Sequence, residues 1–143
     1  MGKLIFYFIL LLTCLSLNGI AQVLRTDASV LKLKAPDTFK AGFITSKGNF
    51  TVEVYRNWSP LGADRFYQLI KTGYYNNTII FRVVKDYLVQ FGVSEDKSKN
   101  IFWQGKNLKD EPVLGSNTDS TICFSRGAPA PERHPFSSTF VTI

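Results

Sequence analysis

The sequence predicts a mainly β, antiparallel protein of one domain, with a short amphipathic helix between two hairpins. Two stretches of alternating apolar residues are joined by a short turn, and two further strand-like stretches follow a helix-like segment. The chain has 143 residues, of which 45% are hydrophobic and 20% are charged. This length suits a single domain, and this composition is that of a globular protein rather than a disordered one.

The first 21 residues have the order of regions found in a secretory signal peptide. Lys3 supplies a positive charge, an apolar run covers residues 4–17, and the segment closes on the small residues Gly19 and Ala21. This order predicts cleavage before Gln22. We therefore expect a secreted or periplasmic protein, or one in the lumen of the secretory pathway.

Two alternatives would attach the chain to a membrane instead. The apolar run of the leader could remain uncleaved as an anchor, although it is short for a membrane span. Residues 11–14 could also form a lipoprotein box with the lipid on Cys14, a reading against which Thr13 argues. After the leader, residues 22–37 predict an N-terminal arm, and the domain itself is expected over residues 38–143.

The positive charge of the chain does not indicate a nucleic-acid-binding protein. The chain carries 17 Lys and Arg residues against 11 Asp and Glu residues, a net charge of +6. These cations are scattered along the sequence and form neither a run nor a stripe interleaved with aromatic residues. We expect a soluble basic surface and no nucleic-acid partner.

Cysteine, histidine and paired acidic residues give no sign of a disulfide, a metal or a carboxylate dyad. Cys123 is the single cysteine after the leader, so it cannot form an intramolecular disulfide, and its apolar neighbours predict a buried thiol. His134 has no partner at metal-ligand spacing. Asp110 and Glu111 form a turn-like acidic pair and not a carboxylate dyad, because adjacent residues in a strand point apart. No metal or cofactor is expected.

The first predicted hairpin covers residues 39–55. Apolar residues alternate over residues 39–45 and again over residues 49–55. Ser46, Lys47 and Gly48 lie between these stretches, and Gly48 can adopt a positive φ without a steric cost.

A helix is predicted directly after this hairpin. Ser59 is a suitable N-cap, Pro60 fits the first helical position, and Gly73 ends the helix. One face is apolar at helical spacing and has to pack on the sheet; it consists of Ala63, Phe66, Leu69 and Ile70.

A polar corner at residues 74–78 leads to the second predicted hairpin, whose strands are residues 79–84 and 88–93. A three-residue turn between them would place Arg82 opposite Gln90, whereas a two-residue turn would place Phe81 there. The residues alone leave both registers open.

The rest of the chain is less regular. Residues 94–120 are polar and predict no clear element, apart from short strand or turn pieces near residues 101–103. Residues 121–125 predict a buried strand, residues 126–136 contain three prolines and predict a loop, and residues 137–143 predict a further strand.

The second hairpin and the helix before it carry a resemblance to a known family. The helix and corner contain FYQLIKTGYYNNT, and residues 81–92 read FRVVKDYLVQFG. This arrangement resembles the signature of the cyclophilin family of peptidyl-prolyl cis/trans isomerases. Position by position, the resemblance implies that Arg82 is the catalytic arginine, that Gln90 is its partner, and that Tyr87 and Leu88 belong to the substrate pocket. It also favours the three-residue turn.

The same resemblance places the other half of the pocket on the later strands. Residues 124–127 and 138–140 match the family's two remaining pocket segments. Three positions depart from the usual pattern: serine replaces glutamine at position 138, arginine replaces asparagine at position 126, and phenylalanine replaces histidine at position 81. The substrate-binding residues implied by the match are Ser125, Arg126, Ser138 and Phe140.

The fold implied by the resemblance is a closed antiparallel β-barrel with capping helices. The chain supplies about six strands and the first helix of that barrel. On this comparison the closing strands, the second helix and a pocket loop with tryptophan, leucine and histidine would follow Ile143. The resemblance therefore implies a barrel that is incomplete at its C-terminal end.

The function implied is peptidyl-prolyl isomerisation that assists the folding of exported proteins. Rotation about an X-Pro bond has a barrier of about 20 kcal/mol, which comes from amide resonance. A guanidinium that donates to the prolyl nitrogen as the bond twists stabilises the transition state more than either planar state. The implied partners are proline-containing polypeptides and cyclosporin-like ligands. The alternative is a non-catalytic module of the same fold that binds proline peptides.

Overall fold

The structure is a computed structural model that describes residues 26–125 and 139–142, the latter as backbone only. The described chain is mainly β with few helices. Its elements in chain order are η2 (Ala28–Lys32), β1 (Thr38–Thr45), β2 (Gly48–Tyr55), η3 (Arg56–Trp58), α2 (Pro60–Lys71), β3 (Arg82–Val84), β4 (Leu88–Phe91), α3 (Lys97–Trp103), β5 (Ile122–Phe124) and β6 (Thr139–Thr142).

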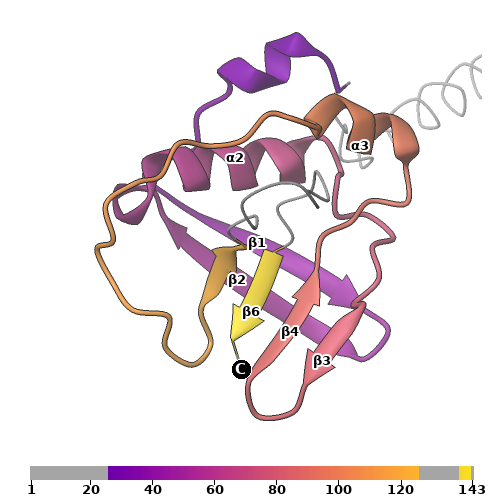
Figure 1. Cartoon of the computed structure of the whole chain (residues 1–143), viewed down its shortest axis with the longest axis vertical. Helices are drawn as coiled ribbons and strands as arrows, with labels where there is room; N and C mark the ends of the chain where they lie inside the picture. Colours follow the sequence, from indigo (N-terminus) through magenta and orange to yellow (C-terminus); the bar gives the residue numbers. More distant parts are fainter. Residues whose placement is uncertain (1–25, 126–138, 143) are drawn as a thin grey trace, which may run out of the picture.

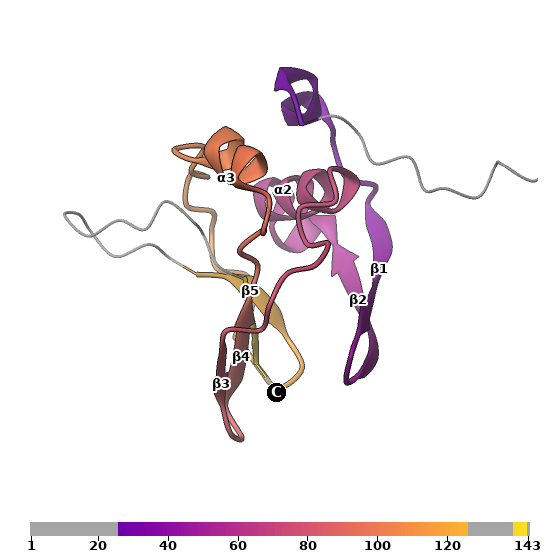
Figure 2. The ribbon, with the colours of Figure 1, turned by 90° about the vertical axis from the view of Figure 1, so that its right-hand side faces the viewer.

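The described strands form two antiparallel sheets. Strands β1 and β2 make a two-stranded sheet, and the other sheet has the order β3-β4-β6-β5. Helix α2 lies across one end of both sheets (Figure 1), and a view turned by 90° shows the two sheets on opposite sides beneath it (Figure 2). Within the described part of the chain, the strands pair into these two sheets and not into one continuous ring.

The first hairpin is confirmed, with a tighter turn than the sequence indicates. Thr45 pairs with Gly48, so two residues form the turn and Gly48 is the first residue of β2. Gly48 has a φ of 132°, a value that glycine adopts readily and other residues do not. The rings of Phe43 and Phe50 lie opposite each other and stack with centroids 4.9 Å apart.

Helix α2 begins at Pro60 and ends at Lys71, as predicted. Gly73 follows with a φ of 60°, and its N–H donates to the carbonyl of Ile70 at 2.9 Å. The N–H of Tyr74 donates to the carbonyl of Leu69, also at 2.9 Å. These two bonds form a Schellman motif, which requires the left-handed conformation that Gly73 supplies.

The second hairpin has the three-residue turn. Arg82 pairs with Gln90 and Val84 with Leu88, so the two-residue alternative is wrong. Asp86 has a φ of 54°, and the N–H of Tyr87 donates to the carbonyl of Val84 at 3.1 Å. Aspartate tolerates this left-handed conformation because its short polar side chain can bond locally. Both strands are shorter than predicted.

Helix α3 corrects the prediction that residues 94–120 contain no clear element. The Asp96 carboxylate caps this helix by accepting from the backbone N–H groups of Ser98 at 2.9 Å and Lys99 at 3.4 Å. With seven residues, the helix is too short to show a repeated apolar face in the sequence. Trp103 at its end is buried, with 6% of its surface exposed.

The N-terminal arm packs onto the domain. The Asp27 side chain caps the short helix η2, and Val30 is 2% exposed. Val30 lies in one buried cluster with Leu69, Tyr74 and Trp103. The arm therefore closes the side of α2 that faces away from the sheets.

The two late strands are confirmed within the predicted stretches. β5 lies in the predicted stretch 121–125, and β6 lies in 137–143. The loop predicted over residues 126–136 lies outside the described residues. The predicted leader, residues 1–21, which contains Cys14, also lies outside them. Among the helices that are described, none is long and apolar enough to cross a bilayer.

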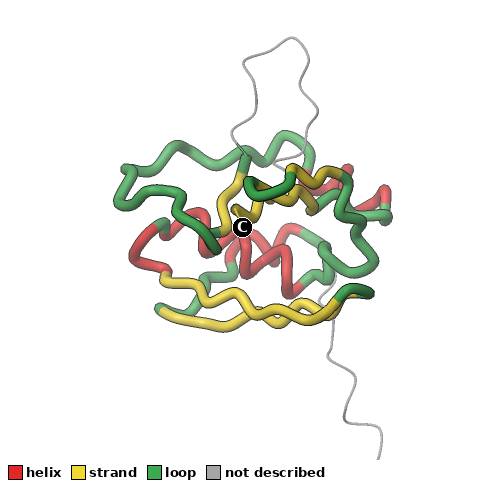
Figure 3. The backbone as a smooth tube through the Cα atoms, turned by 90° about the horizontal axis from the view of Figure 1, so that it is seen from below, coloured by secondary structure: helices red, strands yellow, loops and turns green. Residues whose placement is uncertain are grey.

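Phe66 on α2 lies at the centre of the core between the two sheets. Its ring centroid lies 6.3 Å from those of Phe39 and Phe43 on β1, 5.6 Å from that of Tyr75 and 6.5 Å from that of Phe124 on β5. Seen from below, the helix occupies the space between the hairpin and the other strands (Figure 3). Phe66 is 4% exposed, so one aromatic side chain joins the helix to both sheets.

Candidate active site

One row of paired residues crosses the four-stranded sheet. Arg82 pairs with Gln90, Gln90 pairs with Phe140, and Phe140 pairs with Cys123. Residues that lie directly opposite each other on antiparallel strands project to the same face of the sheet. The sequence could not order these strands, because the pairing of β4 with β6 joins residues about 50 positions apart.

Three residues of this row, Arg82, Gln90 and Cys123, lie on the face of the sheet that points away from the core. Phe91 is 4% exposed, and its ring lies 5.7 Å from that of Phe43 on the facing hairpin. Successive side chains on a strand alternate between faces, so Gln90 projects outward where Phe91 projects inward. Phe124 contacts the core through Phe66, which leaves Cys123 on the outer side.

The candidate residues on this outer face differ in exposure. Arg82 is exposed, while Leu88 and Gln90 are half-buried. Tyr87 lies in the turn and is 60% exposed. Leu88 shares the outer face with Gln90 because the two residues are two positions apart on β4. An exposed cation beside half-buried side chains can reach a ligand laid across the strands.

The Arg82 guanidinium takes no part in the ion pairs found within the described residues. Those pairs join Lys40 to Glu53 at 3.7 Å and Arg56 to Asp64 at 2.8 Å. An arginine on an edge strand, without a carboxylate holding it, keeps its donors available to a bound molecule.

The remaining predicted pocket residues are placed in part. Ser125 follows directly after β5 and is half-buried. Phe140 is fixed by its backbone register beside Gln90. Arg126 and Ser138 lie outside the described residues. The structure thus brings Arg82, Gln90, Leu88 and the Phe140 backbone together on neighbouring strands.

Cys123 ends the row on strand β5. It is half-buried rather than fully buried, because it projects from the outer face and not into the core. Its partial burial raises the pKa of the thiol above the ordinary value. A raised pKa favours the thiol over the thiolate, which is the nucleophilic form.

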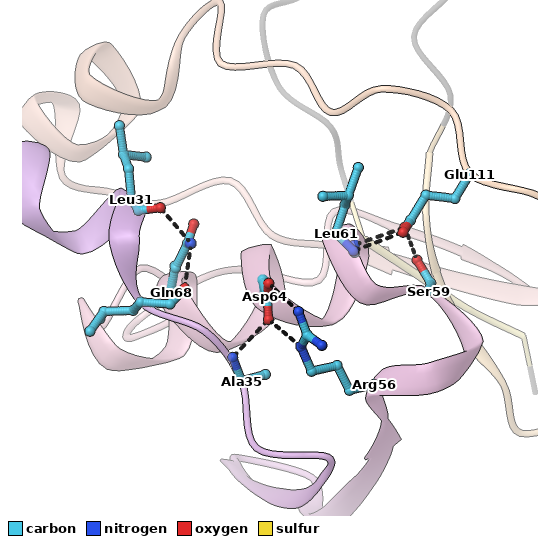
Figure 4. A network of polar contacts seen from close by, with 10 residues as sticks. Leu31, Ala35, Arg56, Ser59, Leu61, Asp64, Gln68 and Glu111 are labelled. Atoms are coloured by element: carbon cyan, nitrogen blue, oxygen red, sulfur yellow. Dashed lines mark hydrogen bonds and ion pairs between the residues drawn. The ribbon is translucent and has the colours of Figure 1, made fainter.

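Glu111 has a structural role that the sequence did not reveal. Its Oε2 accepts from the Ser59 hydroxyl at 2.5 Å and from the Gly62 N–H at 3.0 Å, and its Oε1 accepts from the Leu61 N–H at 2.8 Å (Figure 4). Ser59 occupies the N-cap position, but its side chain makes no capping bond to the helix. The carboxylate therefore caps α2, a role that suits a negative charge at a helix N-terminus.

A second carboxylate fastens the arm to α2. Asp64 accepts from Arg56 Nε at 2.8 Å, from Arg56 Nη2 at 2.9 Å and from the Ala35 N–H at 2.7 Å (Figure 4). The bonds from Arg56 hold the pKa of this carboxyl below its usual range, and burial opposes them. These bonds hold Ala35 and Arg56 against α2, the helix that packs on both sheets.

No metal centre is formed by the described residues. Nowhere among them do three or more His, Cys, Asp or Glu side chains gather closely enough to hold an ion. His134, which the sequence shows without partners, lies outside them. A shallow cleft of about 390 Å³ occurs at the base of the first hairpin, on elements other than those of the row; its lining residues are Asp37, Thr38, Tyr55, Arg56 and Asn57.

Comparison with known proteins supports the resemblance seen in the sequence. Peptidyl-prolyl cis-trans isomerase CYP18-2 of Arabidopsis thaliana is 31% identical over 103 residues, which are 61% of this chain and 63% of that protein. A peptidyl-prolyl cis-trans isomerase of Acinetobacter baylyi is 32% identical over 83 residues, 57% of this chain and 44% of the relative. Peptidyl-prolyl cis-trans isomerase cypE of Dictyostelium discoideum is 46% identical over 48 residues, 34% of this chain and 31% of the relative.

The chain spans less than two thirds of the length of each of these relatives. No solved structure matches it. The family model for cyclophilin type peptidyl-prolyl cis-trans isomerases matches residues 41–141, which cover most of both sheets and all of helix α2. The chain therefore belongs to the cyclophilin-type peptidyl-prolyl cis-trans isomerase family.

Proposed function

We propose that this protein isomerises X-Pro bonds of polypeptides bound on the outer face of the β3-β4-β6-β5 sheet. The observation that carries the proposal is the register of β3 and β4, which sets Arg82 directly opposite Gln90 on that face. Membership of the family supports the same activity. The proposed substrates are proline-containing polypeptides, and cyclosporin-like compounds are proposed ligands of the same face.

In the proposed mechanism Arg82 acts on the prolyl nitrogen. The lone pair of this atom becomes localised on nitrogen as the amide twists out of resonance, and the guanidinium then donates a hydrogen bond to it. The interaction is stronger in the twisted state than in either planar state, so it lowers the barrier in both directions. The step moves no electron and needs no proton transfer, because arginine stays charged throughout.

The neighbouring residues are proposed to hold the substrate. Leu88 lies two positions from Gln90 on β4, and its apolar side chain is proposed to receive the proline ring. Phe140, whose backbone pairs with Gln90, is proposed as a second wall for that ring. Tyr87 lies at the exposed turn and Ser125 follows β5. Both are proposed to contact the residues beside the proline. Arg126 and Ser138 are proposed to complete this surface.

Two further proposals concern the whole molecule. The two sheets are proposed to form parts of the wall of the family's closed barrel, because Phe43 of one sheet contacts Phe91 of the other across the core. The leader over residues 1–21 supports export, so the proposed role is to assist the folding of exported proteins.

A non-catalytic module that binds proline peptides is the second candidate. Arg126 and Ser138 stand where the family resemblance leads one to expect asparagine and glutamine. These changes alter the groups that would hold a substrate and leave Arg82 in place. Binding without efficient turnover would be the result if substrate is held in an unproductive position.

N-terminal sequencing of protein purified from an exported fraction tests export, and exchange spectroscopy on an Ala-Pro peptide tests the activity. We expect the exported protein to begin at Gln22. We expect cis/trans exchange of the peptide to be faster with the protein than without it. The rate should stay the same when EDTA is added. An intact Met1 in a cytoplasmic fraction would contradict export. Peptide binding without faster exchange would favour the binding module, and loss of rate with EDTA would contradict the metal-free mechanism.

A further inference from the structure

The segment that joins α3 to β5, residues 104–121, first runs along helix α2 and then turns away from the helix toward β5 (Figure 1). We call this segment the strap. Near its start, Arg65 Nη1 on α2 donates to the carbonyl of Lys106 at 2.6 Å. In its middle, the Glu111 carboxylate accepts the three hydrogen bonds from the N-terminal end of α2 (Figure 4). Helix α2 therefore holds the strap at two places.

The contact at Glu111 is closely fitted. A Cβ atom at position 62 would lie 2.3 Å from the Ser59 hydroxyl oxygen and 3.7 Å from Glu111 Oε2. Only glycine leaves room for the hydroxyl and the carboxylate to approach the helix backbone together. The position of the carboxylate is thus set by the shape of the helix end, where Gly62 leaves the space that it occupies.

Beyond Glu111 the strap is exposed until it enters the sheet. Val113 is 88% exposed and Leu114 is 69% exposed. A turn at Thr118 to Thr121 follows, in which the Thr121 N–H donates to the Thr118 carbonyl at 3.2 Å. Glu111 is therefore the last half-buried residue of the strap before Thr121. Phe124 of β5 then packs against Phe66 of α2.

We propose that Glu111 is a positioning residue for the substrate face: by fastening the strap to the first turn of α2, it holds β5 and Ser125 in place beside β6. Release of Glu111 would let β5 shift against β6 and would weaken the binding of proline peptides. This inference rests on the proposed function, because it assigns a role to Glu111 through the site on the outer face. The residue itself touches neither Arg82 nor Gln90.

The charge of Glu111 makes this positioning dependent on pH. Burial favours the neutral form of the carboxyl, but its three hydrogen bonds favour the ionised form and lower its pKa overall. Asp64 on α2 opposes this shift, and Arg56 on η3 interacts with both carboxylates. A lowered pKa means that the contact is fully formed above the ordinary value and is lost as the pH falls through the lowered one.

The test compares Glu111→Gln with Glu95→Gln, which makes the same chemical change at an exposed glutamate. Amide hydrogen exchange of Ile122, Cys123 and Phe124 is measured, together with the Kd and KM for an Ala-Pro peptide. For Glu111→Gln we expect exchange faster by about tenfold and Kd and KM raised by about tenfold, since a charged acceptor of two backbone donors is lost. We expect kcat to change little, because binding and not the chemical step is affected.

Ser59→Ala removes one of the three hydrogen bonds and should give a smaller change in the same direction, so it keeps the proposal testable if Glu111→Gln does not fold.

The Kd for the peptide should rise towards acid pH in the parent and stay constant with pH in Glu111→Gln. The proposal would be overturned if amide hydrogen exchange in β5 were unchanged. It would also be overturned if that exchange became faster while the Kd for the peptide stayed the same. A parent that binds the peptide without isomerising it would refute the catalytic function alone, since Kd still decides the role of Glu111.

Discussion

Arg82→Ala is expected to cut the catalysed rate of X-Pro isomerisation by an order of magnitude or more. The variant loses the donor that we place at the prolyl nitrogen, and loss of one such donor costs roughly 2 to 4 kcal/mol of transition-state stabilisation. Stability should hardly change, because Arg82 is exposed and lies on the outer face of β3. Exchange spectroscopy on an Ala-Pro peptide and urea unfolding measure the two effects.

Two further variants make this result specific. Lys85→Ala removes an exposed cation from the turn of the same hairpin and should leave the rate unchanged. Arg82→Lys should restore little activity, because an ammonium group cannot reproduce the planar fork of a guanidinium. An Arg82→Ala variant as fast as the parent would show that Arg82 is an ordinary surface residue, and the binding-module function would then be favoured.

Phe66→Ala is expected to produce the largest loss of stability. Phe66 is 4% exposed and contacts aromatic rings on β1, on β5 and in the corner after α2, so its removal opens a cavity between both sheets. Truncation of a buried phenylalanine costs about 3 to 5 kcal/mol. Urea unfolding should show this loss as a lower midpoint.

Ile44→Ala is the matched control for Phe66→Ala. Ile44 is 90% exposed on β1, so its truncation removes apolar atoms without leaving a buried void. We expect a change within about 0.5 kcal/mol. If the two variants unfold at the same midpoint, Phe66 does not hold the two sheets together as the ring contacts indicate.

Local signals explain which elements could be predicted from the sequence. Ser59, Pro60 and Gly73 marked the ends of α2, and alternating apolar residues marked the first hairpin. The residues alone allowed two registers for the second hairpin, and the one that the family resemblance favoured, with Arg82 opposite Gln90, is correct. This choice depends on the conformation of Asp86, which several residue types can adopt, so the residues alone could not make it.

Contacts between distant parts of the chain explain what the sequence could not show. Glu111 accepts a hydrogen bond from Ser59, which is 52 residues away in the sequence. No local sequence pattern predicts such a pairing. Helix α3 is short and depends on the Asp96 cap and on burial of Trp103. The burial of Val30 against α2 likewise arises from tertiary packing of an arm that reads as irregular.

The candidate site shows the same division. Arg82 and Gln90 are neighbours within one hairpin, so their juxtaposition followed from a local register. The position of Phe140 beside Gln90 depends on the pairing of β6 with β4, which no turn between them specifies. The outward direction of this row follows from the packing of Phe91 and Phe124 against the core.

The most direct test of the proposed substrate face is a titration of isotope-labelled protein with an Ala-Pro peptide, followed by the amide chemical shifts. We expect the largest shifts at Arg82, Leu88 and Gln90 on neighbouring strands of the outer face, and none at Ile44 on the far hairpin. Shifts confined to Asp37 and Asn57, which line the cleft at the base of the first hairpin, would contradict the assignment of the outer face as the prolyl site.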